Sequence, residues 1–240
     1  MCDLENCDPN DLSRPSVSPT DRRLFLAGAL ALPLATILAN VDLAEAQAAK
    51  GVSINQTTAD GRTVSAYFAE ADKKDTPVVI LIHEWWGLND NIKTMAEDIR
   101  AKGFHAIAID LFNGSVATNR DEAKTQTKAV KASEANATIA AWVDWAKANG
   151  NGKVATLGWC FGGGWSLSAA LNTKLDAAVI YYGRVTANAD SLQKLNAPLL
   201  GHFGTLDKSI NPEMVGAFQK NLAQAGKSDL MTTHWYTAGH

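Results

Sequence analysis

The pentapeptide Gly158-Trp159-Cys160-Phe161-Gly162 has the residues of a nucleophilic turn. It follows a predicted strand (154–157) and opens a predicted helix (160–171), which is the setting of the G-x-S-x-G nucleophile elbow, here with cysteine in place of serine. Glycines on both sides of such a tight turn avoid collisions with the adjoining strand and helix. A helix N-terminus lowers the pKa of a cysteine, and the Phe161 N–H would point toward a developing oxyanion. The pattern predicts acyl transfer through a Cys160 thiolate.

Three other interpretations of these glycine- and histidine-containing segments are weaker. The turn at 158–162 could be a close-packed structural turn, but cysteine at its apex favours chemistry. A nucleotide-binding loop would end in Gly-Lys-Ser/Thr, whereas Gly164-Trp165 stands here. The segment His83-Glu84-Trp85-Trp86-Gly87 lacks the second histidine of a zinc protease. We therefore predict no metal site and no organic cofactor.

An acid and then a histidine follow the nucleophile in chain order when this turn is catalytic. Asp207 comes just after a predicted strand (198–203), and a carboxylate there lies at the reactive edge of a parallel sheet. His240 follows a loop of small residues after the last predicted strand (230–236) and can reach over Cys160. His240 is the predicted base, and His234, inside that strand, is the alternative.

Alternating strands and helices must position these residues. Hydrophobic patterning and turn signals predict a mainly parallel sheet with helices on both faces, in a single domain covering residues 49–240. The strands are expected at 51–57, 63–69, 78–82, 105–109, 154–157, 177–182, 198–203 and 230–236, and the helices at 89–102, 121–149, 160–171 and 212–225.

The composition of the chain is that of an ordinary globular protein. Its 240 residues are 46% hydrophobic with a net charge of −3, so no basic surface is predicted and nucleic acid is an improbable partner. We expect a monomer that acts on a small molecule. Two of the three cysteines, Cys2 and Cys7, precede a predicted export signal, so its cleavage leaves Cys160 without a disulfide partner.

The N-terminal 48 residues have the pattern of an export signal. Arg22-Arg23 precede an apolar run (24–39), which is followed by the small-x-small sequences Ala44-Glu45-Ala46 and Ala46-Gln47-Ala48. Adjacent arginines before apolar residues resemble a twin-arginine signal. We expect a cleaved leader, a periplasmic location and no stable membrane association. An uncleaved anchor is the alternative, although 16 apolar residues are short for a bilayer span.

The motifs together resemble the dienelactone hydrolase family of α/β-hydrolases. The resemblance covers about residues 51–240 and rests on the turn around Cys160 and on the segments His83-Glu84-Trp85-Trp86-Gly87-Leu88, Tyr181-Tyr182-Gly183, Gly204-Thr205-Leu206-Asp207 and Tyr236-Thr237-Ala238-Gly239-His240. It implies an α/β-hydrolase fold and a Cys160-His240-Asp207 triad that cleaves a small ester or lactone through a thioester.

The resemblance also implies roles for residues around the triad. Glu84 would contact the resting thiol and help to form the thiolate when substrate enters; the alternative is a structural buried carboxylate. The N–H groups of Trp85 and Phe161 would stabilise the oxyanion. Trp86 and Tyr182 would contact the substrate, although core packing is an equal alternative for the tryptophans.

Two departures from the family pattern bear on function. Members acting on dienelactone carry an arginine after the fourth strand that holds the substrate carboxylate, but Asp110-Leu111-Phe112-Asn113-Gly114-Ser115 contains none. Arg120 and Arg184 are candidate substitutes, and a broad carboxylesterase is the alternative activity. Family members also continue past the histidine into a final helix, which this sequence lacks. A non-catalytic binding or redox-sensing protein is the remaining alternative.

Overall fold

A computed structural model describes residues 51–240 of the chain. The predicted export signal lies outside these residues, as does the predicted start of the domain at residue 49. Within the described residues, none of the helices combines the length and hydropathy that a membrane span requires.

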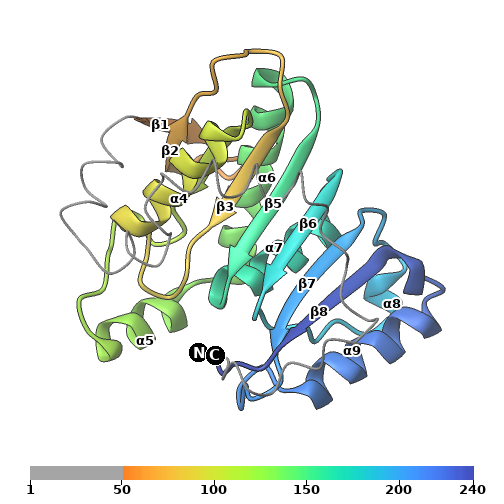
Figure 1. Ribbon diagram of the computed structural model, residues 1–240. Coiled ribbons are helices and arrows are strands. Elements are labelled where there is room, and N and C mark those ends of the chain that lie inside the picture. The colour runs from red at the N-terminus through yellow and green to blue at the C-terminus, as the bar shows by residue number, and fades with distance from the viewer. Residues whose placement is uncertain (1–50) are drawn as a thin grey trace, which may run out of the picture. The chain divides into compact units, whose positions relative to one another are not determined.

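The described residues form alternating strands and helices (Figure 1). The strands are β1 (Val52–Thr57), β2 (Thr63–Ala69), β3 (Val78–Ile82), β4 (His105–Ile109), β5 (Val154–Trp159), β6 (Ala177–Tyr181), β7 (Leu199–Gly204) and β8 (Met231–Tyr236). The helices are α4 (Asp90–Ala101), α5 (Arg120–Ala129), α6 (Ala132–Asn149), α7 (Phe161–Asn172), α8 (Ala189–Leu192) and α9 (Pro212–Gln224), with a 3₁₀ turn at Ser228–Leu230.

The strands form one sheet in the order β1-β2-β4-β3-β5-β6-β7-β8. Strands β1 and β2 are antiparallel to their neighbours, and every pairing from β4 to β8 is parallel. Because the strands from β4 to β8 run in one direction, the loops that leave β3, β5, β6, β7 and β8 meet at one edge of the sheet. The predicted mainly parallel sheet is confirmed.

Side chains that alternate along β3 bury both faces of the sheet. Ile80 and Ile82 lie in the core beneath α6 and α7, whereas Leu81 lies in the core beneath α4. All three are fully buried. This burial explains the unbroken apolar run Val78–Ile82 and confirms helices on both faces.

The expected helix at 121–149 is two helices, and this is the main error in the predicted elements. The backbone of Val130 is extended, with φ −67° and ψ 119°, so α5 ends there and α6 begins at Ala132. Only Ala123 of α5 is buried, whereas six residues of α6 are buried against the sheet. The break lets polar α5 leave the sheet, and its Gln126 Nε2 donates to the Trp85 carbonyl at 2.6 Å. Neither glycine nor proline marks this break in the sequence.

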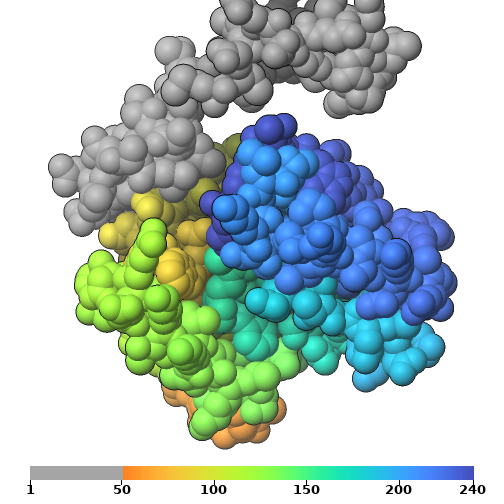
Figure 2. All heavy atoms as spheres, turned by 90° about the horizontal axis from the view of Figure 1, so that it is seen from below, coloured from red at the N-terminus to blue at the C-terminus, as the bar shows by residue number. Residues whose placement is uncertain are grey.

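Figure 2 shows the molecule from the side where these loops gather. The region of α5 (light green) and the C-terminal segments (blue) lie on either side of a central area (green to teal) that includes α7. The predicted site residues therefore come from segments far apart in sequence.

Candidate active site

Cys160 lies in a strained turn between β5 and α7. Its backbone has φ 51° and ψ −113°, a conformation that non-glycine residues rarely adopt. A Cβ on Gly158 would lie 2.1 Å from the Gly162 carbonyl oxygen, and one on Gly162 would lie 2.1 Å from the Ile82 carbonyl oxygen. Glycine is therefore required at both positions. The turn exposes the sulfur at the start of α7.

Hydrogen bonds join three of the predicted residues in a line. His240 Nε2 lies 2.9 Å from Cys160 Sγ, and His240 Nδ1 lies 2.7 Å from Asp207 Oδ2. Since the carboxylate can only accept, Nδ1 carries the proton and Nε2 is free to take one from the thiol. His234, the alternative base, instead stacks on His202 within the sheet, with ring centroids 5.3 Å apart.

Asp207 is buried, and backbone donors fix its orientation. The N–H groups of Ser209 and Ile210 donate to Oδ1 at 2.7 and 2.9 Å, which leaves Oδ2 for His240. Burial by itself would raise the pKa of Asp207, but the hydrogen bonds from Ile210, His240 and Ser209 outweigh it and lower the pKa. The carboxylate is therefore ionised and holds the imidazole in one tautomer.

The Cys160 thiol is half-buried, and its pKa is raised to about 11. Burial is the main cause, and the negative charges of Glu84 and Asp207 act in the same direction. A hydrogen bond from the Phe161 N–H opposes them. The helix N-terminus lowers the thiol pKa through the Phe161 N–H, as expected, but burial and the two carboxylates outweigh this contribution in the free protein. The resting sulfur is a neutral thiol.

Glu84 contacts Tyr182 rather than the sulfur. Tyr182 Oη donates to Glu84 Oε1 at 3.1 Å, and the Tyr182 ring lies edge-on to His240 with centroids 5.2 Å apart. Burial and the charge of Glu84 raise the pKa of Tyr182, so its hydroxyl stays protonated. Cys160 feels the charge of Glu84, but its hydrogen-bonding partner is His240.

Trp85 and Trp86 take different places. Trp85 lines the cleft beside Cys160, and within residues 51–240 its N–H has no acceptor. Trp86 packs edge-on against Trp85, with centroids 5.1 Å apart, and its carbonyl accepts from Ala117. Trp86 is not among the residues that line the cleft, whereas Tyr182, the other predicted substrate contact, is one of them.

A cleft of about 700 Å³ opens over the sulfur. Arg184 is exposed on its wall, and among residues 51–240 it has no ion-pair partner. Arg120, the other candidate cation, begins α5 and does not line the cleft. The lining residues include Trp85, Cys160, Phe161, Trp165, Ser168, Tyr182, Arg184 and His240.

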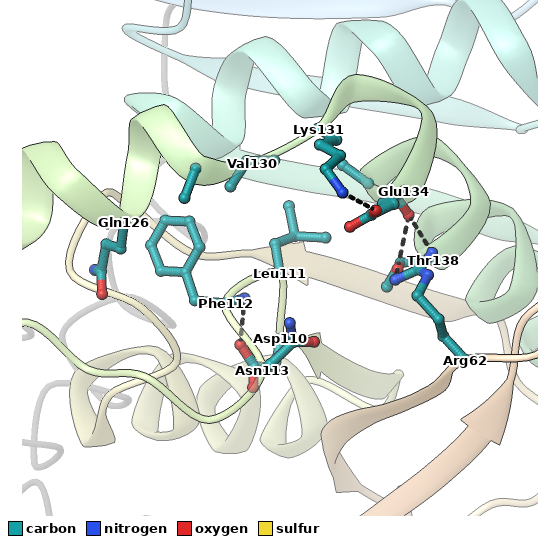
Figure 3. Close-up of a pocket in the computed structure, with 12 residues that line it drawn as sticks. Arg62, Asp110, Leu111, Phe112, Asn113, Gln126, Val130, Lys131, Glu134 and Thr138 are labelled. Carbon is teal, nitrogen blue, oxygen red and sulfur yellow. Dashed lines mark hydrogen bonds and ion pairs between the residues drawn. The ribbon is translucent and has the colours of Figure 1, made fainter.

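A second, smaller pocket of about 130 Å³ lies between the loop after β4 and helices α5 and α6 (Figure 3). Its charged side chains are paired with groups that line the same pocket. Arg62 donates to the Glu134 carbonyl at 2.8 Å, and Lys131 pairs with the Glu134 carboxylate at 2.9 Å. The Asp110 carboxylate accepts from the Phe112 N–H at 2.7 Å. The contact of Arg62 connects α6 to the loop before β2. Cys160 and His240 line the larger cleft and not this pocket.

Sequence reasoning left some site residues unplaced. Arg184 follows β6 by three residues, so its place at the carboxyl edge of the sheet was a usable signal. Gln126 had no such signal, because its contact with Trp85 depends on the unpredicted end of α5. Among residues 51–240, no group of three or more His, Cys, Asp or Glu side chains is arranged to hold a metal ion.

Comparisons with known proteins agree with this architecture. The model of the dienelactone hydrolase family matches residues 64–240. A protein of Escherichia coli O157:H7, provisionally named a carboxymethylenebutenolidase, is 31% identical over 201 residues, covering 75% of this chain and 73% of the relative. Carboxymethylenebutenolidase 1 of Cupriavidus pinatubonensis is 24% identical over 202 residues, covering 79% and 84%. A crystal structure from Klebsiella pneumoniae, provisionally described as a dienelactone hydrolase, has a TM-score of 0.70 at 24% identity, covering 79% and 87%.

Proposed function

Because the chain belongs to the dienelactone hydrolase family and has its α/β-hydrolase fold, we propose that it hydrolyses small carboxylic esters or lactones with Cys160 as nucleophile. The observation that carries this proposal is the hydrogen-bonded line from buried Asp207 through His240 to Cys160, at the mouth of a 700 Å³ cleft. Such a line of acid, base and nucleophile is the arrangement that acyl transfer requires.

In the first step, the ester carbonyl enters beside Cys160 and the thiol proton passes to His240 Nε2. The sulfur attacks the carbonyl carbon, and the N–H groups of Phe161 and Trp85 stabilise the oxyanion. The carbon–oxygen bond of the ester then breaks. His240 gives its proton to the leaving alkoxide, and the acyl group remains on sulfur as a thioester.

In the second step, water takes the place of the released alcohol. His240 removes a proton from the water, which attacks the thioester carbonyl, and the oxyanion again rests on the same two N–H groups. The carbon–sulfur bond breaks, the acid leaves and the sulfur recovers its proton. Asp207 stabilises the imidazolium in both steps, so that no other proton carrier is needed.

Glu84 contributes to keeping the sulfur protonated in this proposal. Its charge raises the thiol pKa, so Glu84→Gln should lower that pKa while keeping a partner for the Tyr182 hydroxyl. We expect the pH profile of alkylation by iodoacetamide to move to lower pH in the variant, because thiolate forms more readily once the negative neighbour is neutral.

The exposed Glu70, substituted Glu70→Gln, is the control and should leave the profile unchanged. A profile that stays in place or moves to higher pH in Glu84→Gln would contradict this electrostatic role. Loss of ester hydrolysis in the same variant, despite a more acidic thiol, would show that Glu84 also takes part in proton transfer.

Arg184 is the residue that favours acid-bearing substrates in this proposal. Its unpaired guanidinium faces the cleft, where it can bind a substrate carboxylate. We expect Arg184→Gln to raise KM for a dienelactone by about tenfold and to leave KM for neutral p-nitrophenyl acetate nearly unchanged, since one charge-assisted hydrogen bond contributes about 1.5–3 kcal/mol.

Arg120→Gln is the matched control, because Arg120 is exposed outside the cleft. It should change neither KM. Equal effects of Arg184→Gln on both substrates, or none on the lactone, would remove Arg184 from substrate selection and favour a broad carboxylesterase.

A further inference from the structure

His83 lies between the two residues whose N–H groups are proposed to bind the oxyanion. It follows β3 directly and is completely buried. Its ring stacks on Phe161 with centroids 6.0 Å apart, and its Nδ1 lies 2.6 Å from the Glu84 carbonyl oxygen. The first turn of α7 packs closely against the His83 backbone, since a Cβ on Gly162 would lie 2.6 Å from the His83 carbonyl oxygen.

The backbone fixes the tautomer of His83. The Leu111 N–H donates to His83 Nε2 at 3.1 Å, so this nitrogen presents a lone pair and carries no proton. The single ring proton is therefore on Nδ1, and it is donated to the Glu84 carbonyl. Burial lowers the pKa of His83, although the Glu84 carbonyl and the Asp110 charge 4.0 Å from Nε2 oppose this effect. The ring therefore stays neutral, and its single proton, on Nδ1, is donated to the Glu84 carbonyl.

Two hydrogen bonds hold the Glu84 carbonyl, the short one from His83 and a longer one from the Gly87 N–H at 3.3 Å, and the direction of this carbonyl determines where the Trp85 N–H points. The Glu84 carbonyl and the Trp85 N–H belong to one peptide group, which is planar and trans. The two groups therefore point in opposite directions, so a carbonyl held toward His83 turns the N–H away from it. Gln126 holds the next peptide through the Trp85 carbonyl at 2.6 Å. The Trp85 N–H, with no acceptor among residues 51–240, is left for the cleft.

We propose that His83 is a positioning residue for ester hydrolysis, whose Nδ1–H anchors the Glu84 carbonyl and so holds the Trp85 N–H in the oxyanion site. This inference rests on the proposed function, in which that N–H stabilises the transition state. His83 never touches the substrate. It acts only through the orientation of one peptide group, and its ring packing aligns that group with the second donor, Phe161.

Two substitutions separate this role from ordinary core packing. In His83→Asn, the amide nitrogen falls near the position of Nδ1 and can still donate to the Glu84 carbonyl. In His83→Gln, the amide group falls near Nε2 and can still accept from Leu111, but the bond to Glu84 is lost. Each variant loses one hydrogen bond, so their melting temperatures should fall by similar amounts.

Their activities should differ. We expect His83→Gln to lower kcat for p-nitrophenyl acetate by about 10- to 100-fold with little change in KM, because a misdirected oxyanion donor weakens only the transition state. His83→Asn should keep kcat within about threefold of the original protein. Equal losses in both variants, or a larger loss in His83→Asn, would overturn the proposal.

A second measurement needs no turnover. In protein carrying isotope-labelled tryptophan, the Trp85 amide resonance should move in His83→Gln and keep its position in His83→Asn. If the original protein and Cys160→Ala hydrolyse esters at equal rates, the proposed function fails, whereas the amide resonance still reports on the anchoring. A Trp85 resonance that is the same in both variants and the original protein would overturn the positioning role itself.

Discussion

Substitution of Cys160 by alanine should reduce kcat/KM for p-nitrophenyl acetate by about 10⁴-fold or more, because no other group can accept the acyl chain in the proposed reaction. A loss of this size corresponds to about 5.5 kcal/mol of transition-state stabilisation. The fold should survive, since alanine keeps the Cβ that the strained turn already accommodates. Initial rates measure the loss of activity, and the circular dichroism spectrum of the variant measures whether it is folded.

The other two cysteines provide the control. The double substitution Cys2→Ala and Cys7→Ala changes residues outside the described part of the chain and should retain full activity. Cys160→Ser should keep only a small fraction of the rate. A serine hydroxyl is a weaker acid than the thiol, so His240 removes its proton less readily. Comparable rates in Cys160→Ala and the original protein would exclude the cysteine as nucleophile and favour a binding or redox-sensing protein.

Asp207→Asn should have the second-largest effect, a fall in kcat of about 10³- to 10⁴-fold. The N–H groups of Ser209 and Ile210 will hold the amide oxygen of the new side chain where Oδ1 now lies. Its NH₂ group must then face His240 Nδ1, which has to accept instead of donate. The proton moves to Nε2, and the imidazole can no longer take a proton from Cys160.

Kinetics and structure can separate this tautomer effect from unfolding. The exposed Asp229, substituted Asp229→Asn, is the matched control and should keep full activity. Asp207→Asn should remain folded, because both backbone donors keep their acceptor. A variant that retains more than about a tenth of the original kcat would show that Asp207 does not determine the state of the base.

The sequence alone allows much of this site to be predicted. Cys160 and Asp207 each follow a buried strand of the parallel sheet, and chain order together with this place after a strand identifies the acid. The predicted elements are correct where an unbroken apolar run marks a buried strand, as in β3, and the structure places the two residues at one edge of the sheet.

The remaining features depend on packing that local sequence does not encode. The break at Val130 has no glycine or proline, yet it places Gln126 against the Trp85 loop. The raised thiol pKa arises from burial and from two carboxylates distant in sequence, which together outweigh the lowering by the N–H at the helix N-terminus. The sequence assigns no role to His83, and only its contacts with Leu111 and Glu84 reveal the proposed one.

The most direct test of the account is the mass of the protein during turnover. The protein is mixed with p-nitrophenyl acetate, quenched in acid within the first turnover, and mapped by peptide mass spectrometry. We predict an acetyl group on Cys160, as a thioester that hydroxylamine removes and that later decays as free acetate forms. An acetyl group on a serine or histidine instead, or continued turnover after Cys160 has been fully carboxymethylated, would contradict the account.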